Sequence, residues 1–398
     1  MGLSAEHDGI IELSGQPKIG SKFVEYLSEY NPDAVDPIIE IAITPNRPDA
    51  LGVRGIARDL AARGIGSLKT AKTPIINGTH KNNIEIAIDA DVLEKGCPVF
   101  YSCLIKGVKN GPSPKWLKNR IESIGLRSIS TLVDITNYFT MDRARPLHVF
   151  DADKIKGEIS VRFAKKNESF KALDGNEYKL TEDNVVVADS NGVISLAGII
   201  GSQHCSITKE TKNIIVESAF FQPSAMANKA RKLKLQTESS QRFERGVDYN
   251  LPKKAFIELQ SIIFKNKICD FSDFNFSDCE DYLPKQKQVK IEFNKIRKVI
   301  GVDLKDEDIE KLLLSIGCDF NKKSQIATNP SYRFDLNIHA DYIEEVARIY
   351  GYDNIPIVSE KINIEPSKQY PPFKMINTIK NYLYNNGYYE CINYSFVN

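Results

Sequence analysis

The chain has 398 residues, 42% hydrophobic and 26% charged, which is the composition of a globular protein with room for roughly two to four domains. Lys and Arg total 53 and Asp and Glu total 52, so an RNA site would have to be a local patch. No apolar run approaches the ~18 residues that cross a bilayer, the N-terminus lacks a signal-peptide pattern, and the seven cysteines are scattered without a CxxC pair. These features favour a reducing cytoplasm.

The first part of the chain is expected to hold one strand and one helix. The apolar run 38–43 is typical of a short buried strand, and a proline-rich segment breaks it. Asp49 is expected to cap a helix that ends at Gly64. The turn-rich stretch 71–83 predicts a linker, so the next domain is expected to begin at residue 84.

Residues 84–272 predict a single mixed domain of helices and strands. Short apolar runs between 159 and 201 are separated by Asp174-Gly175 and Asn191-Gly192, two dipeptides that favour hairpin turns. Apolar periodicity and capping residues predict further helices at 113–125, 223–235 and 251–265.

A second, smaller unit is predicted at 289–356, after an irregular charged linker at 273–288. Its expected elements are a strand at 289–293, short helices around Ile296 and Ile309, a strand near Ile326 and a helix at 341–350. In the remaining residues, 357–398, we expect a helix at 372–385 and the start of a strand at Cys391, as if a further domain followed. The fold class is therefore α+β, with several domains.

Standard enzyme signatures are largely absent. The sequence contains no GxxxxGK[ST] phosphate loop, no GxGxxG, no GxSxG and no HExxH. Its five histidines leave few candidates for base catalysis.

Three local strings carry the functional signal. The first is Arg127-Ser128-Ile129, leading through Val133-Asp134-Ile135-Thr136-Asn137-Tyr138 to Arg145-Pro146-Leu147-His148-Val149-Phe150-Asp151. The second is Ala197-Gly198-Ile199-Ile200-Gly201-Ser202, continuing to Glu217-Ser218-Ala219-Phe220-Phe221. The third is Thr237-Glu238-Ser239-Ser240-Gln241-Arg242-Phe243-Glu244-Arg245-Gly246-Val247-Asp248. Together they closely resemble the editing domain of bacterial phenylalanyl-tRNA synthetase beta subunits. Flanking strings at 44–49, 329–335 and 344–352 resemble the structural domain before it and the small winged-helix-like domain after it.

The resemblance implies a domain map for a fragment of that subunit. It makes 1–83 a remnant of the N-terminal structural domain with a linker, 84–272 the editing domain, 273–288 a linker, 289–356 the small winged-helix-like domain, and 357–398 the start of a truncated catalytic-like domain.

The resemblance also implies hydrolysis of mischarged Tyr-tRNA(Phe). A phenylalanine pocket rejects an isostere with one added hydroxyl only on the order of 10²-fold, so a second hydrolytic site is needed. Glu217 is expected to contact the tyrosine hydroxyl, because phenylalanine would leave its buried carboxylate unsatisfied, at a cost of roughly 1–3 kcal/mol. Since no nucleophile–base–orienter triad is visible, we expect an attacking water oriented by His148, with help from a tRNA ribose hydroxyl.

Four further residues are assigned by the resemblance. Arg127, with His148, is expected to flank the ester. Gly198 is expected to let the backbone approach the amino acid, and Thr237 and Ser239 to line the pocket floor. The family usually has alanine where Ser239 stands.

Each assignment has a structural alternative. His148 could be a buried histidine bonded to the backbone, and Glu217 could be the solvated end of the strand that precedes it. Arg127 could interact with a helix dipole. Thr237 and Ser239 could be a helix cap, a role compatible with lining a pocket.

A basic cluster accompanies the third string: Lys229, Arg231, Lys232, Lys234, Arg242 and Arg245. Contact with the tRNA acceptor end is one interpretation, because phosphate neutralisation dominates affinity for RNA. A solvated helix face is the other.

An acidic set lies in the small domain: Asp335, Asp341, Glu344 and Glu345. All-carboxylate sets suit a hard cation such as Mg²⁺, and the resemblance implies a magnesium ion shared with an alpha subunit. The alternative is that Asp341 and Glu344 form a capping pair at the start of a helix.

The resemblance implies an alpha-subunit partner in an (αβ)₂ tetramer, tRNA(Phe) as the nucleic-acid partner, and no membrane. ATP, phenylalanine and the aminoacylation chemistry are expected on the alpha subunit. Two other interpretations stay open: a non-catalytic RNA-binding or scaffold fragment, and a free-standing editing factor that acts without an alpha subunit.

Overall fold

The computed structural model describes residues 15, 18–30, 38–69, 78–265, 270–278, 280–358 and 370–396. The chain divides into two compact units, Met1–Ile355 and Pro356–Asn398, each described here by itself. The first unit contains both helices and several β-sheets, which confirms the predicted α+β class. Among the described helices, none has the length and apolar character needed to cross a membrane.

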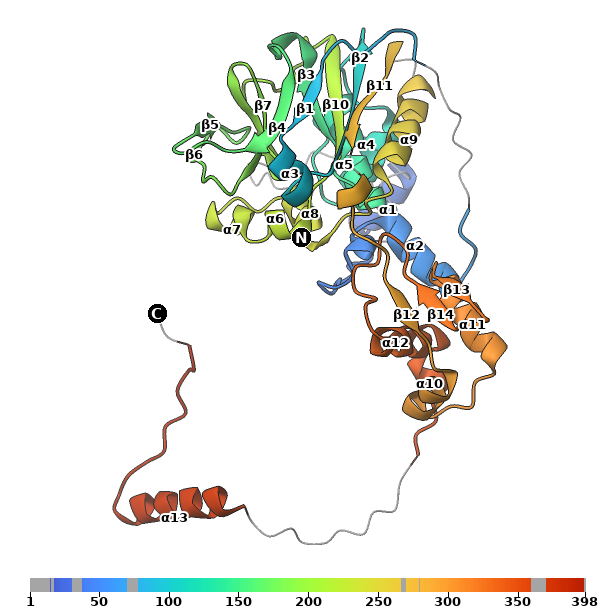
Figure 1. The fold of residues 1–398 in the computed structure, drawn as a ribbon, viewed down its shortest axis with the longest axis vertical. Coiled ribbons are helices and arrows are strands. Elements are labelled where there is room, and N and C mark those ends of the chain that lie inside the picture. Colours follow the sequence, from blue (N-terminus) through green and yellow to red (C-terminus); the bar gives the residue numbers. More distant parts are fainter. Residues whose placement is uncertain are drawn as a thin grey trace. The chain divides into compact units, whose positions relative to one another are not determined.

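Two β-sheets form the upper part of the first unit in the view of Figure 1. The five-stranded sheet has the order β1 (Ile86–Ile88), β4 (Ile159–Phe163), β7 (Val185–Asp189), β8 (Gly192–Leu196) and β9 (Ile200–Gly201). The four-stranded, antiparallel sheet has the order β11 (Asp270–Asp278), β2 (Val99–Lys106), β10 (Asn213–Phe220) and β3 (His148–Asp151). A hairpin of β5 (Ser169–Lys171) and β6 (Glu177–Lys179) and the short helix α3 (Ala90–Lys95) accompany them.

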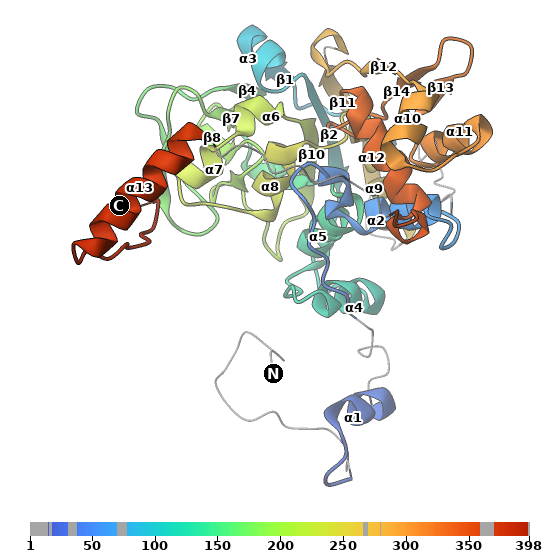
Figure 2. The ribbon, with the colours of Figure 1, turned by 90° about the horizontal axis from the view of Figure 1, so that it is seen from below.

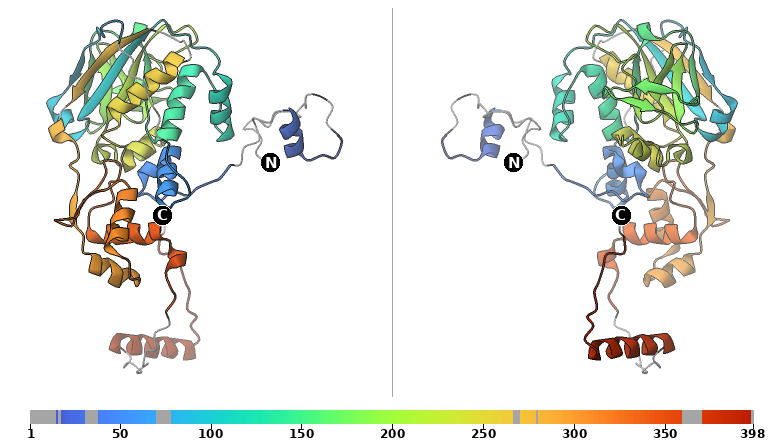
Figure 3. Two further views of the ribbon diagram at one scale, coloured as in Figure 1. Left: turned by 90° about the vertical axis from the view of Figure 1, so that its right-hand side faces the viewer. Right: turned by 90° about the vertical axis from the view of Figure 1, so that its left-hand side faces the viewer.

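The two faces of the four-stranded sheet pack against different partners, because successive side chains of a strand point to opposite sides. In β10, Ile215 and Ala219 belong to a core shared with β4, β7 and β8 of the other sheet. Ile214 and Val216 belong to a second core, built with the helices α4 (Lys115–Ser123), α5 (Thr131–Arg143) and α9 (Pro252–Lys265). Figure 3 shows these three helices beside the sheet. Glu217, one residue after Val216, therefore lies on the face of β10 that looks toward the other sheet.

Both predicted hairpin turns are confirmed. Gly175 has a φ of 86° between β5 and β6, and Asp174 Oδ1 accepts a hydrogen bond from the Asn176 N–H at 3.0 Å. Gly192 has a φ of 133° and begins β8 directly after the turn from β7. Positive φ values are the reason that glycine is favoured at these two positions.

The prediction of one continuous helix at 223–235 is wrong. It is divided into α6 (Pro223–Met226) and α7 (Lys229–Lys232), and Asn228 between them has a left-handed φ of 62°. Asparagine tolerates this conformation better than most residues. The chain then continues into α8 (Glu238–Arg245), whereas the predicted helix 251–265 is confirmed as α9.

The predicted linker 273–288 starts too early, because its first residues belong to β11. This strand pairs with β2 from Asp270↔Lys106 to Asp278↔Val99, with a register shift between Phe271 and Phe274. The linker was predicted from the acidic and then basic composition of 273–288, and composition does not reveal the pairing with β2.

Of the N-terminal region, the structure describes α1 (Phe23–Tyr30), a 3-10 turn at Pro48–Leu51 and α2 (Val53–Ala62). The strand expected at 38–43 is wrong: the segment has no regular structure, and Ile38 and Ile39 are 71% and 78% exposed. Asp49 does not cap the helix, since its carboxylate is buried and pairs with Arg47 at 2.9 Å. Most of the predicted linker 71–83, like residues 1–14, lies outside the described residues.

The small domain is a three-stranded antiparallel sheet with three main helices, consistent with the winged-helix-like expectation. Its elements are β12 (Gln288–Lys290), α10 (Phe293–Ile300), α11 (Asp306–Ser315), β13 (Asp319–Asn321), β14 (Ile326–Thr328) and α12 (His339–Tyr350), in the sheet order β12-β14-β13. Apolar residues of all three helices share one core with Ala327 of β14. The sequence had missed β13, which has only three residues.

In the second unit, the structure describes one helix, α13 (Pro371–Asn385), labelled in Figures 1 and 2. It confirms the helix expected at 372–385. The strand expected to start at Cys391 is not formed: the residues around it have no regular structure and are exposed.

Candidate functional site

A cavity of about 240 Å³ is lined by both sheets and by α5 and α8. Five of the six residues predicted for the site lie on its wall: His148, Gly198, Glu217, Thr237 and Ser239. They come from β3, the β8–β9 turn, β10 and α8, so the fold joins positions that are up to 91 residues apart in the sequence.

Glu217 is the buried acid of this cavity, with 5% of its surface exposed. The suggestion that it ends a strand in solvent is wrong, because β10 continues to Phe220. Its Oε2 atom has no hydrogen-bond partner among the described residues. Burial raises the pKa of Glu217 to about 8, although the charge of Arg145 acts in the opposite direction. The group is therefore mainly a neutral carboxyl at pH 7, able both to donate and to accept a hydrogen bond.

Arg145 lies behind the cavity wall and is fully buried. Pairing between β3 and β10 stops at His148↔Glu217, and beyond that point Arg145 Nη2 donates to Ser218 Oγ at 3.1 Å and to the Ala219 carbonyl. Burial lowers the pKa of Arg145 to about 10, opposed by Asp248 and Glu217, so the guanidinium remains charged at neutral pH. Arg145 thus covers the free edge of β10 and places a positive charge near Glu217.

His148 stands opposite Glu217 on the neighbouring strand. Its ring centroid is 4.5 Å from that of Phe150, and a Cβ atom at Gly201 would lie 2.5 Å from its Cε1 and Nε2 atoms. Glycine at 201 therefore makes room for the ring. Burial lowers the pKa of His148 to about 4, so the imidazole is neutral at pH 7 and one ring nitrogen can accept a hydrogen bond.

Thr237 caps α8 and lines the cavity, so both interpretations hold for it, whereas Ser239 lines the cavity and makes no capping hydrogen bond. Thr237 Oγ1 accepts from the Ser240 N–H at 3.0 Å and donates to the Ile199 carbonyl at 2.9 Å. Ser239 Oγ donates to the Gly198 carbonyl at 2.9 Å. The start of α8 is thereby fixed to the β8–β9 turn.

Gly198 is required by packing in the core. Its φ is 67°, and an added Cβ atom would lie 2.8 Å from Met226 and 3.1 Å from Phe221 and Phe243. A side chain at this position would thus collide with the core behind the cavity wall.

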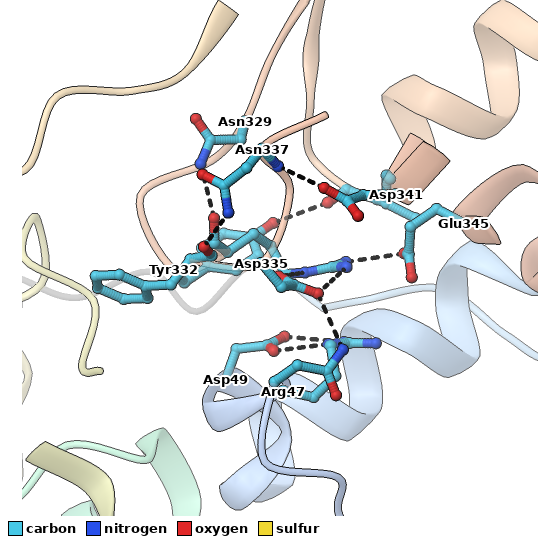
Figure 4. Close-up of polar contacts among 12 residues, drawn as sticks. Arg47, Asp49, Asn329, Tyr332, Asp335, Asn337, Asp341 and Glu345 are labelled. Atoms are coloured by element: carbon cyan, nitrogen blue, oxygen red, sulfur yellow. Dashed lines mark hydrogen bonds and ion pairs between the residues drawn. The ribbon is translucent and has the colours of Figure 1, made fainter. Parts of the chain in front are cut away.

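Two members of the acidic set of the small domain, Asp335 and Glu345, are paired with arginines; both acids are labelled in Figure 4. Arg333 is 2% exposed and pairs with Asp335 and Glu345, each at 2.8 Å, and Arg348 Nη2 lies 2.7 Å from Glu345. Burial alone would raise the pKa of Glu345, but the hydrogen bonds from Arg348 and Arg333 outweigh it and bring the pKa to about 2. Arg348 also reaches Asp59 of α2 at 2.8 Å, which ties the small domain to the N-terminal segment.

Asp341 is a helix cap. Its Oδ2 atom accepts hydrogen bonds from the backbone N–H groups of Asn337 and Ile338, at 2.7 and 2.8 Å, at the start of α12 (Figure 4). Glu344 is exposed on the same helix. The four carboxylates thus do not point toward a common centre, and the capping interpretation is confirmed for Asp341.

A different group of possible metal ligands does converge among the described residues. Asp189, His204 and Cys205 offer ligand atoms that lie within 4.8 Å of one another. This set mixes oxygen, nitrogen and sulfur, whereas Mg²⁺ prefers oxygen ligands.

Comparison with known proteins gives matches for the region around the cavity and for the small domain, and both matches point to the same family. A family model described as "B3/4 domain" matches residues 96–267, and one described as "tRNA synthetase B5 domain" matches residues 289–352. The phenylalanine–tRNA ligase beta subunit of Ruegeria pomeroyi is 41% identical over 399 residues, covering 99% of this chain and 49% of that protein. The subunit of the same name from Paramagnetospirillum magneticum is 41% identical over 363 residues, covering 89% and 44%.

The chain belongs to the phenylalanine–tRNA ligase beta-subunit family. It spans about half the length of the curated relatives it matches. A solved N-terminal fragment of the phenylalanyl-tRNA synthetase beta subunit from Pyrococcus horikoshii aligns with a TM-score of 0.40 and 19% identity, over 83% of this chain and 94% of that one.

One residue assigned from the family pattern does not reach the cavity. Arg127 is exposed in the loop between α4 and α5 and is not part of the cavity wall. The following residues are tied elsewhere, since Ser128 Oγ and the Ile129 N–H donate to buried Asp134 at 2.5 and 2.9 Å. The helix-dipole alternative for Arg127 is not tested by any contact.

The sequence analysis missed the contribution of α5 and of Arg145. Thr136, Asn137 and Thr140 of α5 line the cavity. These residues fall in or beside the strings that carried the resemblance, but α5 itself was not predicted, so nothing in the sequence placed them opposite Glu217.

The four carboxylates of the small domain do not fit magnesium in this arrangement. Two are paired with the buried Arg333, one accepts two backbone N–H groups, and one is exposed on its own. A cation would have to displace guanidinium groups that already balance the negative charge.

Proposed function

We propose that this chain carries the hydrolytic editing site of a phenylalanine–tRNA ligase beta subunit and cleaves tyrosine from mischarged tRNA(Phe). The observation that carries the proposal is the buried Oε2 atom of Glu217, which lacks a hydrogen-bond partner among the described residues, on the wall of a 240 Å³ cavity. A polar group buried in this way costs free energy unless a ligand supplies a partner.

Tyrosine and phenylalanine differ by the one group that Glu217 can bind. The phenolic O–H of tyrosine would supply the missing hydrogen bond, either as donor or as acceptor to the neutral carboxyl. Phenylalanine would fill the same volume and leave Glu217 unpaired. A site that hydrogen-bonds a hydroxyl group strongly rejects an analogue that lacks this group. An apolar pocket discriminates much more weakly between ligands that differ only in size.

His148 suits the role of orienting the attacking water. It lies on the same cavity wall as Glu217, and its neutral imidazole can accept a hydrogen bond. A group with a pKa of about 4 is a weak base at pH 7. Water activation would therefore depend on positioning and on help from a ribose hydroxyl of the tRNA, with no covalent enzyme intermediate.

The remaining activities belong to the whole ligase. We infer that an alpha subunit provides ATP, phenylalanine and aminoacylation, that the two subunits form an (αβ)₂ tetramer in the cytoplasm, and that magnesium acts in that complete assembly. The four small-domain carboxylates are assigned no ion in this chain, because arginine and backbone partners already engage three of them.

The test is deacylation of Tyr-tRNA(Phe) by the purified chain, beside Phe-tRNA(Phe), at tRNA concentrations up to saturation. A Gly201→Ala variant would drive a methyl group into the His148 ring and should lose most of the activity. Gly111→Ala is the matched control, because a Cβ atom there meets nothing within 4 Å and should leave the rate unchanged.

Hydrolysis of Tyr-tRNA(Phe) that collapses in Gly201→Ala alone would support an editing site at this cavity. Absence of hydrolysis by the unaltered chain at saturating tRNA would favour the scaffold interpretation. Activity without an alpha subunit would still be compatible with either a subunit fragment or a free-standing factor, and co-purification with an alpha subunit distinguishes these two.

A further inference from the structure

A second cavity, of about 700 Å³, shares Thr237 and Glu238 with the first one. It lies at the outer side of α8 and is also lined by Arg231 of α7, Arg245 of α8 and Pro45 of the N-terminal segment. Figure 1 shows α7, α6 and α8 in a row below the sheets, with α6 between the other two. Its volume falls within the range of about 300–1,000 Å³ that is usual for small-molecule sites.

Some side chains of the predicted basic cluster form ion pairs or hydrogen bonds within the protein, and others do not. Lys229 pairs with Asp183, and Arg242 is 3% exposed and donates to Glu238 at 2.5 Å and to the Leu51 carbonyl at 2.7 Å. These two residues hold the protein together and are not a surface patch. Lys232 and Lys234 are exposed and outside the second cavity.

Arg231 and Arg245 are the cationic residues that line the second cavity. Within the part of the chain that the structure describes, neither one takes part in a salt bridge or side-chain hydrogen bond. The two acids on the same wall are engaged: Glu238 is paired with Arg242, and Glu244 accepts from the Asn228 N–H at 3.2 Å. The cavity therefore combines two free guanidinium groups with one acid that is neutralised by an ion pair and one, Glu244, that accepts a backbone hydrogen bond.

We propose that this second cavity is a subsite for the single-stranded nucleotides that precede the aminoacylated 3′ end of the RNA, with Arg231 and Arg245 binding their phosphates. The inference rests on the proposed function and adds to it the route by which the substrate enters. An amino acid held beside Glu217 remains esterified to the terminal ribose, so the preceding nucleotides must lie immediately outside the first cavity. The shared wall at Thr237 and Glu238 is where such a chain would cross.

The amides of Gln236 and Gln241 also line the second cavity and could contact base edges. Guanidinium groups bind phosphate oxygens in a bidentate manner, which gives arginine an advantage over lysine here. The two exposed lysines of the same region would instead add a general attraction for RNA, without regard to its 3′ end.

The test measures binding of two uncharged RNA hairpins to the full chain by fluorescence anisotropy. One hairpin copies the tRNA(Phe) acceptor stem with its single-stranded 3′ end, and the other lacks those unpaired nucleotides. We expect the complete hairpin to bind more tightly, and the Arg231→Ala/Arg245→Ala variant to remove this difference while the affinity for the truncated hairpin stays the same.

The salt dependence provides a second readout. Loss of two phosphate contacts to a single strand should lower the slope of log K against log salt by roughly 1.4 for the complete hairpin. Lys232→Ala is the matched control on α7, and it should weaken binding of both hairpins by the same factor. Arg231→Lys with Arg245→Lys keeps the charge and should restore part of the lost affinity if phosphate is the ligand.

Equal affinities of the double-alanine variant and the unaltered chain for the complete hairpin would overturn the subsite, even if Tyr-tRNA(Phe) is hydrolysed. A selective loss for the complete hairpin, in a chain that does not hydrolyse Tyr-tRNA(Phe), would support the subsite and refute the proposed function. Equal losses for both hairpins would also overturn the subsite, since they would show a general electrostatic role.

Discussion

Glu217 of the B3/4 region and Glu345 of the B5 region are both buried acids, 5% and 3% exposed, yet their environments are opposite. Glu217 has an oxygen without a partner and a pKa raised to about 8. Glu345 lies between Arg333 and Arg348 and has a pKa of about 2. Burial disfavours the charge in both cases, and the number of neighbouring donors decides the outcome.

The comparison separates a group available to a ligand from a group used by the fold. Both carboxylate oxygens of Glu345 accept hydrogen bonds from Arg333 or Arg348. These arginines also bind Asp335 and Asp59, and so join the small domain to α2. Glu217 stabilises nothing in the described structure through Oε2. Buried polar atoms left unpaired are costly, which is why the cavity around Glu217 is the better candidate for chemistry.

The largest effect is expected from Arg333→Met. It leaves Glu345 and Asp335 with fewer partners in a buried position, so the free energy of unfolding should fall by about 3–5 kcal/mol. Urea denaturation followed by circular dichroism measures this.

Arg297→Met is the matched control in the same domain, because Arg297 pairs with the half-exposed Asp306 and should cost about 1 kcal/mol or less. Equal losses for the two variants would contradict the view that the acids of the small domain depend on buried arginines.

Glu217→Gln should raise the free energy of unfolding, and the size of the increase should depend on pH. The unfolded carboxyl has a pKa of about 4.3 and the folded one about 8, so the folded state binds more protons between these values. Stability of the unaltered chain therefore falls as the pH rises through this window. Glutamine is uncharged at every pH, so the variant avoids this loss and at pH 8 should be more stable by about 2–4 kcal/mol.

At pH 4.5 the same two proteins should differ little, because Glu217 is then largely protonated when folded and about half protonated when unfolded. Denaturation curves at both pH values measure the difference. A constant offset at pH 4.5 and pH 8 would show that Glu217 is ionised in the folded chain and that the comparison with Glu345 is mistaken.

A smaller effect is expected at the start of α8. Thr237→Ala removes the cap to Ser240 and the bond to Ile199, at a cost of about 1–2 kcal/mol. Thr237→Ser keeps the hydroxyl and should retain most of the stability. Thermal denaturation of both variants measures these effects. If serine destabilised the protein as much as alanine, Thr237 would act through packing of its methyl group and not through its hydrogen bonds.

The smallest effect is expected from Ser239→Ala, which introduces the residue usual in the family. The Ser239 hydroxyl is satisfied by the Gly198 carbonyl at 2.9 Å, so its loss should cost about 1 kcal/mol or less. The preference for Tyr-tRNA(Phe) over Phe-tRNA(Phe) should stay within about twofold. A larger change in the ratio of the two deacylation rates would mean that this hydroxyl contacts the amino acid.

The sequence predicted much of the local structure because the signals were local. Asp174-Gly175 and Asn191-Gly192 specified their turns through positive φ values. α9 and α13 followed from capping and periodicity. The errors occurred where pairing between distant segments decides whether a strand forms. The run 38–43 has no strand partner in the described structure, and β11 becomes a strand only by pairing with β2.

The site was predicted through resemblance, and the structure adds the physical reasons. Five of the six assigned residues line one cavity, but Arg127 does not, because Asp134 holds the loop that follows it. The acidic set of the small domain was the other failure: sequence spacing placed carboxylates on one helix face without revealing the arginines between them. Partners distant in sequence cannot be read from the spacing of one element.

The most direct test of the account compares deacylation of Tyr-tRNA(Phe) and Phe-tRNA(Phe) by the unaltered chain and by Glu217→Ala. We expect the unaltered chain to prefer the tyrosyl ester. The variant should lose about 5- to 150-fold of that preference, the equivalent of 1–3 kcal/mol for one buried hydrogen bond. An unchanged ratio of the two rates in Glu217→Ala would contradict the claim that the unpaired carboxyl of Glu217 selects the substrate.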